Sequence, residues 1–180
     1  RWGEEAGRFV EGGSTVEVEA MTRESEPSAP LTDMEAALVR DLWASTKGMG
    51  MQSAGVVLFR NLFQLAPGLL ELFSFRHEHD LFNSAKLKMH AIAVVGTVGL
   101  AVGKIGKLEE VAPKVKGLAL KHTGYGVQPE HYDVLGKAWL QTLEATLGGD
   151  FNQSARIAWS KFWNRFSIMI VAAATERTSR

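Results

Sequence analysis

The chain has 180 residues, 46% hydrophobic and 22% charged, which is typical of one globular domain with a sizeable core. Twenty basic and twenty acidic residues give zero formal net charge, so nothing indicates a nucleic-acid partner or an anionic membrane surface. The absence of cysteine excludes disulfides, zinc–thiolate sites, iron–sulfur clusters and thiol catalysis.

The composition of residues 1–30 predicts a flexible acidic tail. They hold seven glutamates against three arginines, are rich in Gly, Ser and Pro, and show no apolar periodicity. No secretory signal is visible there. The longest charge-free run, residues 89–103, is shorter than the roughly 20 residues of a membrane span. We therefore expect a cytoplasmic protein without a membrane span, in which residues 31–180 form the folded domain.

From residue 32 onward, apolar residues recur every three or four positions, which predicts helices and no strands. Thr32 followed by Glu35 is a capping-box signature for the first helix. A second helix is expected over about residues 52–65. Pro67 is well placed to begin a short third helix, because proline is favoured in a first helical turn. The polar stretch "SFRHEHD", residues 74–80, is predicted to be a loop.

The second half of the chain continues the helical pattern. Asn83 or Ser84 is expected to cap a helix that extends to about residue 101. One apolar face then runs over residues 108–122 and is ended by two glycines. Another helix begins at Pro129, and a long last helix covers about residues 154–175. The sequence therefore predicts an all-α domain of about seven helices.

The five histidines differ in their surroundings. His77 and His79 lie in the charged loop and His131 in the first turn of a helix, so all three are expected to be exposed. His90 borders the apolar face of its helix, and His122 lies on the apolar face of the next one. A lone histidine at such a position is usually a hydrogen-bonded core residue. Two of them, 32 residues apart on separate helices, can instead face one cavity.

Few kinds of chemistry suit two imidazoles on apolar faces. Zinc takes three or four protein ligands, and no Cys, Asp or Glu joins these faces. A di-iron site needs Glu-x-x-His motifs, which are absent. Ser84 and Thr123 are the nearest candidates for a catalytic partner, but their spacing supports no triad. A planar metal macrocycle buried by Phe, Val and Leu, with axial nitrogen ligands, would fit.

Four segments, in this order, resemble the globin family, and neuroglobin-type globins in particular. They are "VVLFRNLFQLAPGLLELFSF" (residues 56–75), "LKMHAIAVV" (87–95), "LALKHTGYGV" (118–127) and "ARIAWSKFW" (155–163). The resemblance runs from about residue 31 to residue 174. Each match is weak alone, but their order and spacing together are specific.

The resemblance implies a globin fold, a three-over-three sandwich of about eight helices around one haem b (iron protoporphyrin IX). It makes His122 the proximal iron ligand and His90 the distal residue and possible sixth ligand. Small residues at Gly55 and Ala91 would allow two helices to cross closely. The haem-contacting set that it implies is Phe59, Phe73, His90, Val94, Leu118, His122, Val127, Tyr132, Leu135 and Phe166.

The sequence also departs from neuroglobins. Ala93 stands where they carry a lysine near a haem propionate, and the cysteines of their redox-sensitive disulfide are absent. The N-terminal tail has no counterpart in the family core. A propionate partner at position 93 and a disulfide switch are therefore not expected.

The family implies reversible binding of O2, CO and NO, with a bis-histidine resting state. Haem-based enzyme activity of the NO dioxygenase or nitrite reductase kind needs no further residue, but steady turnover would require an external reductase. Redox signalling or electron transfer through partner contacts is a third possibility, and a haem-free helical scaffold is the fourth. A monomer or weak dimer is expected.

Overall fold

The computed structural model describes residues 30–175, and these form helices and connecting loops without a strand. The predicted tail, residues 1–30, lies outside the described residues except for its last position. The elements are α2 (Asp33–Gly48), α3 (Met51–Leu65), η1 (Pro67–Leu72), η2 (Leu81–Asn83), α4 (Ala85–Val102), η3 (Leu108–Glu110), α5 (Ala112–Gly124), α6 (Pro129–Leu147), η4 (Gly148–Asp150) and α7 (Gln153–Thr175).

Local sequence signals account for most helix boundaries. The Thr32 hydroxyl accepts a hydrogen bond from the Glu35 amide at 3.2 Å, and the Glu35 carboxylate accepts one from the Thr32 amide at 2.8 Å. This confirms the predicted capping box. Of the two candidate caps for α4, Ser84 accepts the bond from the Leu87 amide. The helix α6 begins at Pro129, as predicted.

The apolar face over residues 108–122 does not form one helix. Residues Leu108–Glu110 make the 3-10 turn η3, and α5 begins only at Ala112. The reason is Pro113, which lacks an amide proton and is tolerated in the first turn of a helix but not in its interior. The apolar face is therefore present, but it spans two separate helical segments, η3 and α5.

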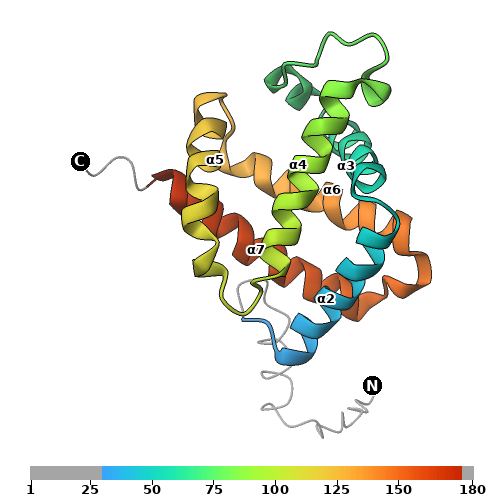
Figure 1. Ribbon diagram of the computed structural model, residues 1–180, viewed down its shortest axis with the longest axis vertical. Coiled ribbons are helices and arrows are strands. Elements are labelled where there is room, and N and C mark those ends of the chain that lie inside the picture. Colours follow the sequence, from blue (N-terminus) through green and yellow to red (C-terminus); the bar gives the residue numbers. More distant parts are fainter. Residues whose placement is uncertain (1–29, 176–180) are drawn as a thin grey trace, which may run out of the picture.

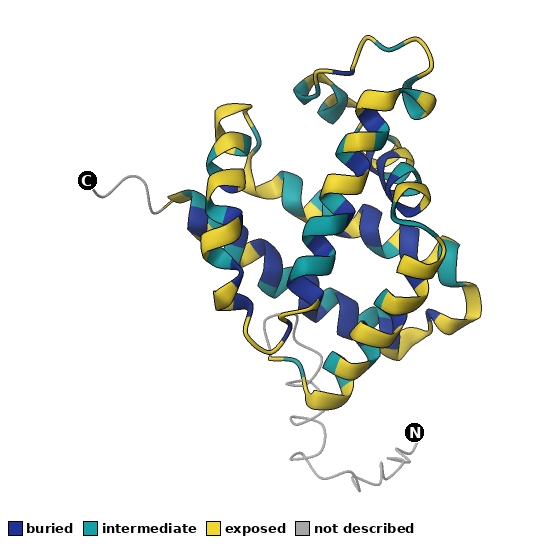
Figure 2. Ribbon diagram, in the orientation of Figure 1, coloured by how far each residue is buried: buried dark blue, intermediate teal, exposed yellow. Residues whose placement is uncertain are grey.

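The helices form two layers. In Figure 1, α4 stands in the centre and α5 to its left, while α6 and α7 run behind them. The helix α3 packs against both α4 and α6, and α7 contacts α2, α5 and α6. Buried residues lie where the layers meet, and the outward faces are exposed (Figure 2). The predicted all-α helical sandwich is confirmed.

The crossing of α3 and α4 depends on glycine. A Cβ atom placed on Gly55 would lie 2.7 Å from the Ala91 Cβ and 2.9 Å from the Ala91 carbonyl oxygen. Any side chain at residue 55 would therefore push the two backbones apart. This confirms the prediction that small residues allow the helices to cross closely, and the crossing fixes where α4 places His90.

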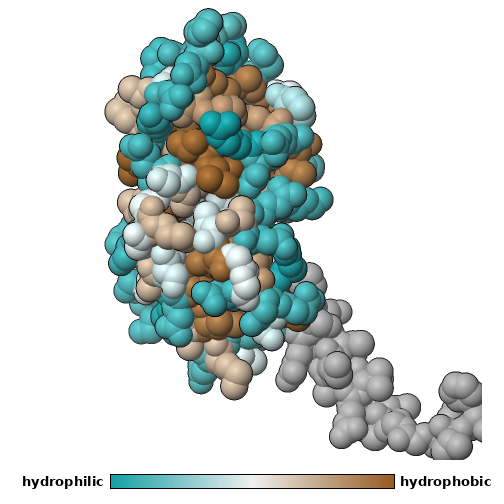
Figure 3. All heavy atoms as spheres, turned by 90° about the vertical axis from the view of Figure 1, so that its right-hand side faces the viewer, coloured by the Kyte–Doolittle hydropathy of each residue, from teal (hydrophilic) through white to brown (hydrophobic). Residues whose placement is uncertain are grey.

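By length and composition alone, α4 could cross a membrane, and it is the one such helix in residues 30–175. The expectation from the sequence considers only the charge-free run 89–103, which is too short for a membrane span. The helix α4 is longer than that run, because it begins four residues earlier and includes Lys86 and Lys88. A core helix of a folded protein passes the same test. In this fold, α4 packs against α3 and lines a cavity. On the face shown in Figure 3, hydrophobic residues form separate patches among hydrophilic ones.

Candidate functional site

A cavity of about 500 Å³ opens among α3, α4, α5, α6 and the loop that follows η1. A second cavity of about 140 Å³ extends it toward α7, and the two share six wall residues. The larger volume lies within the roughly 300–1,000 Å³ of typical small-molecule and cofactor sites. The shared wall consists of His90, Val94, Leu118, His122, Tyr132 and Leu135. The two cavities therefore form one continuous slot.

All ten residues of the predicted haem-contacting set border this slot. Nine line the larger cavity, and Phe166 lines the smaller one beside α7. They come from α3, the loop after η1, α4, α5, the loop before α6, α6 itself and α7. Side chains from distant parts of the sequence thus meet in one mainly apolar space, with two imidazoles among them.

His122 lies in the last turn of α5 with its ring orientation fixed. Its Nδ1 atom donates a hydrogen bond to the Leu118 carbonyl oxygen, one turn earlier, at 2.8 Å. A carbonyl can only accept, so the neutral ring carries its proton on Nδ1 and Nε2 keeps a free lone pair. Such a bond to the second nitrogen is how metal-binding histidines are normally oriented. His122 is therefore prepared to act as a ligand.

His90 reaches the slot from α4 and is packed among aromatic rings. The ring centroids of Phe59, Phe73 and Phe75 lie 5.4, 5.5 and 5.9 Å from that of its imidazole. Within the described part of the chain, the imidazole of His90 makes no hydrogen bond. Its pKa is lowered by burial and, secondly, by the nearby charge of His122. At neutral pH, His90 therefore presents an uncharged imidazole with an available lone pair.

Phe75 is a wall residue that sequence reasoning missed. The sequence pattern places it in the polar loop, yet it is only 3% exposed and stacks on Phe73 with ring centroids 4.9 Å apart. The loop backbone turns back at residues 73–78, where two carbonyls accept bonds from amides three residues later, and this carries Phe75 inward. The available signal was the "FSF" pattern, two aromatic residues separated by one.

The mouth of the cavity holds polar residues that the sequence did not assign to the site. Lys121, Tyr125 and His131 line it. His131 was expected to be exposed, but it is half-buried, and its Nδ1 accepts a hydrogen bond from the Gln128 amide at 3.1 Å. It is therefore held by the first turn of α6. Burial also raises the pKa of Tyr132, deeper in the wall.

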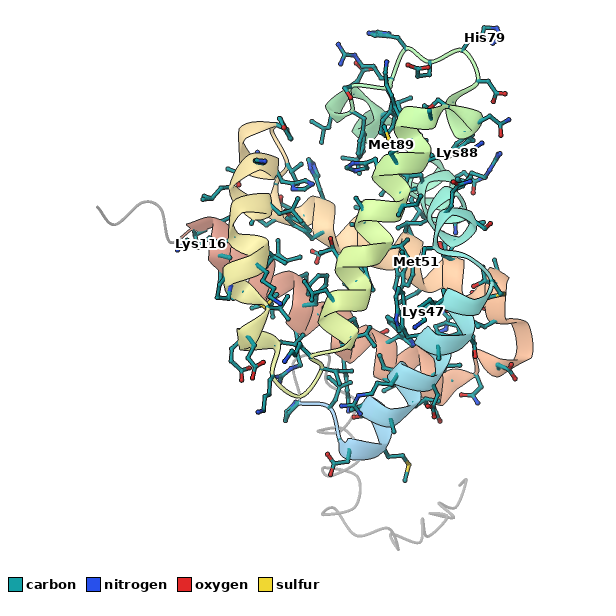
Figure 4. All side chains as sticks on the ribbon, in the orientation of Figure 1. Lys47, Met51, His79, Lys88, Met89 and Lys116 are labelled. Atoms are coloured by element: carbon teal, nitrogen blue, oxygen red, sulfur yellow. The ribbon has the colours of Figure 1, made fainter. Side chains whose placement is uncertain are left out.

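The structure also shows the positions of the loop histidines and of the two hydroxyl residues considered as catalytic partners. His77 and His79 are not buried, and Figure 4 shows His79 projecting from the loop at the top of the molecule. Ser84 caps α4, and Thr123 donates to the Ala119 carbonyl oxygen at 3.1 Å. Among the described residues, neither is hydrogen-bonded to a histidine, so no triad is formed there. Residues 30–175 contain no group of three or more His, Cys, Asp or Glu that could hold a metal.

Comparison with known proteins adds an independent result. The Globin family model matches residues 56–170. The chain is 29% identical to a neuroglobin of Tetraodon nigroviridis and 30% identical to neuroglobin-1 of Oncorhynchus mykiss, each over 146 residues, 79% of this chain and 89% of the relative. It is also 27% identical to an anaerobic nitrite reductase of Brassica napus, over 83% of this chain and 95% of that protein.

The family match covers most of the described helices, including both histidines and every wall of the slot. The helical sandwich and the apolar cavity between α4 and α5 agree with it. The family implies a haem cofactor, and the two imidazoles with the apolar walls have the chemistry to hold one. The chain belongs to the globin family and is similar within it to the neuroglobins.

Proposed function

We propose that the slot binds haem b and that Nε2 of His122 is the proximal iron ligand. The observation that carries this proposal is the Nδ1 hydrogen bond of His122 to the Leu118 carbonyl, which leaves one nitrogen lone pair available in an apolar cavity. The predicted haem-contacting set would cover the ring, with Phe73 and Leu135 among its apolar contacts. The haem would supply the iron to which small gases bind.

His90 would act on the opposite side of the haem and coordinate iron in the resting protein. Its imidazole is neutral and has no hydrogen-bond partner in the described residues, so nothing there holds its lone pair away from a metal. The rings of Phe59, Phe73 and Phe75 pack around it and shield part of it from solvent. With an internal ligand, the apparent gas affinity equals the intrinsic affinity multiplied by the fraction of protein in which His90 has moved away, so a small open fraction gives a low apparent affinity.

The function that this arrangement supports best is reversible binding of O2, CO and NO in the cytoplasm. When His90 is displaced, its N–H can donate a hydrogen bond to a bound gas that carries partial negative charge. A second candidate is nitrite reduction, favoured by the similarity to the Brassica napus protein named as an anaerobic nitrite reductase. Sustained turnover would then require an external reductant.

The test is ultraviolet–visible spectroscopy of purified protein titrated with haemin, in ferric, ferrous and CO-bound forms. We expect a Soret band and a low-spin ferrous spectrum. His122→Ala should bind haem weakly or not at all. His90→Ala should keep haem, become five-coordinate and bind CO faster, whereas His79→Ala, outside the slot, should match the parent. No Soret band would refute the haem proposal, and a high-spin ferrous parent would refute coordination by His90.

Nitrite reduction is tested separately. The reduced, haem-loaded protein is mixed with nitrite without oxygen, and NO-bound haem is followed by its absorption. Faster formation in His90→Ala than in the parent is expected, because nitrite must reach the site that His90 occupies. Rates in the parent no higher than those of free haem would exclude this second candidate.

A further inference from the structure

The positive charge of the described domain is concentrated in one stretch of the chain. Residues 30–175 hold fifteen basic and twelve acidic side chains. Five of the basic and two of the acidic ones lie in residues 103–125, which form the α4–α5 connection and α5, and the rest of the domain is balanced at ten and ten. The net charge of +3 therefore belongs to residues 103–125. We call their five lysines the basic surface: Lys104, Lys107, Lys114, Lys116 and Lys121.

Two lysines of the basic surface carry charge that no described residue neutralises. One carboxylate, that of Glu110, lies 2.7 Å from the Lys104 ammonium and 3.7 Å from that of Lys107. The hydrogen bond from Lys104 holds the pKa of Glu110 below its ordinary value of 4.5, and Lys107 and Lys114 lower it further. Lys114 and Lys121 are exposed, and neither forms an ion pair within residues 30–175.

These two lysines share one face of α5, and this face leads to the cavity. They are seven residues apart, which places them two turns and about 10.5 Å apart along the helix. Leu118 lies between them on the same face, is 38% exposed and lines both cavities. Lys121 lines the mouth of the larger cavity. A molecule bound along this face would therefore stand over the entrance of the slot.

The same chain contains a segment of matching charge. Residues 17–26, which we call the acidic segment, hold four glutamates and one arginine and so carry a net charge of −3. The segment lies outside the described residues, which begin at Pro30. An extended chain spans about 3.4 Å per residue, so Glu26 can reach about 14 Å and Glu17 about 45 Å from Pro30. The 13 residues of α5 cover about 20 Å.

The point of attachment of the acidic segment favours contact with α5. The pair of Glu35 with Lys161 holds the first turn of α2 on α7, and η3 and α5 pack against α7 as well. Both α2 and α5 begin in the lower half of the molecule in Figure 1. Attachment through a short linker gives an effective concentration on the order of millimolar. A free anionic partner would have to exceed that concentration or bind more tightly.

We propose that the acidic segment docks on Lys114 and Lys121 of the same chain and covers the mouth of the slot. The charges match in sign and number, −3 on residues 17–26 and +3 on residues 103–125. Contacts between exposed charges are screened by salt, so docking weakens as ionic strength rises. Access to the slot would then depend on ionic strength. The proposal concerns the chain itself and does not depend on haem.

The test is cross-linking of the full chain with a carbodiimide, which joins a carboxylate directly to an amine, followed by peptide mass spectrometry. Reactions are compared at about 10 mM and about 1 M salt, where the screening length is about 30 and about 3 Å. Lys47, in the last turn of α2, serves as the control because it is exposed and, as Figure 4 shows, lies away from α5. An equal mixture of isotope-labelled and unlabelled chains distinguishes links within one chain from links between two.

We expect links from the glutamates of residues 17–26 to Lys114 and Lys121, within one chain and severalfold more abundant than links to Lys47. High salt should suppress them severalfold. Lys114→Gln should also reduce the links to Lys121 severalfold, because one of the two docking charges is lost, whereas Lys47→Gln should leave them unchanged.

Three results would overturn the proposal. Links spread evenly over Lys47, Lys114 and Lys121, or links unaffected by salt, would show chance collision instead of docking. Links found only between labelled and unlabelled chains would assign the basic surface to a second copy. Links to Lys114 that never include Lys121 would show that the acidic segment does not cover the mouth. None of these results bears on whether the slot binds haem, which spectroscopy tests separately.

Discussion

Replacing Glu35 by Gln should destabilise the fold far more than replacing its partner Lys161 by Met. The Lys161 ammonium on α7 lies 2.7 Å from the Glu35 carboxylate on α2, with the lysine side chain 2% exposed and the glutamate 19%. A glutamine at residue 35 can still accept the Thr32 amide bond of the capping box. The substitution therefore removes the ion pair while the helix cap is kept.

The expected magnitudes follow from which charge is left without a partner. Breaking a buried pair by removing one member costs about 3–5 kcal/mol. We expect the lower end, about 3 kcal/mol for Glu35→Gln, since Glu35 is partly exposed and water can reach the pair. For a chain of this size that corresponds to a fall in Tm of roughly 6–12 °C. In Lys161→Met, the Glu35 carboxylate can still be hydrated and still accepts the hydrogen bond from the Thr32 amide. This variant should therefore lose less than about 1 kcal/mol of unfolding free energy.

The assay is urea unfolding of the haem-free protein, followed by far-ultraviolet circular dichroism, so that cofactor binding does not contribute. The double variant should be more stable than Glu35→Gln alone, because it no longer buries an unpaired ammonium. Equal losses in the two single variants, or a double variant as unstable as Glu35→Gln, would refute this reasoning.

The same pair makes a prediction about pH. Burial would raise the pKa of Glu35, but bonds from Lys161 and Thr32 hold it below the ordinary value of 4.5. A lowered pKa in the folded state means that the contribution to stability is complete above pH 4.5 and is lost as the pH falls through the lowered value. Glu35→Gln should therefore lose its disadvantage relative to the parent at acid pH.

The remaining predictions concern the helix crossing and the cavity wall. Gly55→Ala should destabilise by about 1–3 kcal/mol in urea unfolding, because its Cβ meets Ala91. Gly96→Ala, on α4 but with open space around its Cβ, should stabilise by about 0.5–1 kcal/mol, and equal effects at the two glycines would contradict the close crossing. In haem-free Tyr125→Phe, the Tyr132 phenol should titrate above its ordinary pKa of 10 in absorbance at alkaline pH, because burial disfavours the phenolate. Titration at or below 10 would show that Tyr132 is solvated.

The helix content, and the positions of His90 and His122 relative to apolar helix faces, could be predicted from the sequence because they depend on local patterns. Apolar residues every three or four positions, the cap at Thr32 and the prolines at helix starts each act within a few residues. The haem-contacting set came from resemblance to globins, and the fold brings all of its members to one slot. Their role toward haem is a proposal that spectroscopy can test.

Other features depend on contacts between distant segments. Phe75 is buried because its loop turns back over α3, and His131 is half-buried because α6 begins at the mouth of the slot. The Glu35–Lys161 pair joins residues 126 positions apart, and the ring contact of Trp43 with Trp139 joins α2 to α6. No local pattern specifies such contacts.

The sequence by itself determined most of the helices, which of their faces are apolar, and that His90 borders one such face and His122 lies on another. Only the tertiary structure decided that these faces enclose a common cavity, and that Trp139 and Trp159 bury their N–H groups without an acceptor in the described chain. The reason is physical: periodicity arises from the geometry of a single helix. Burial, and hydrogen bonds that join different helices, arise from the distances between helices, which the close crossing at Gly55 helps to set.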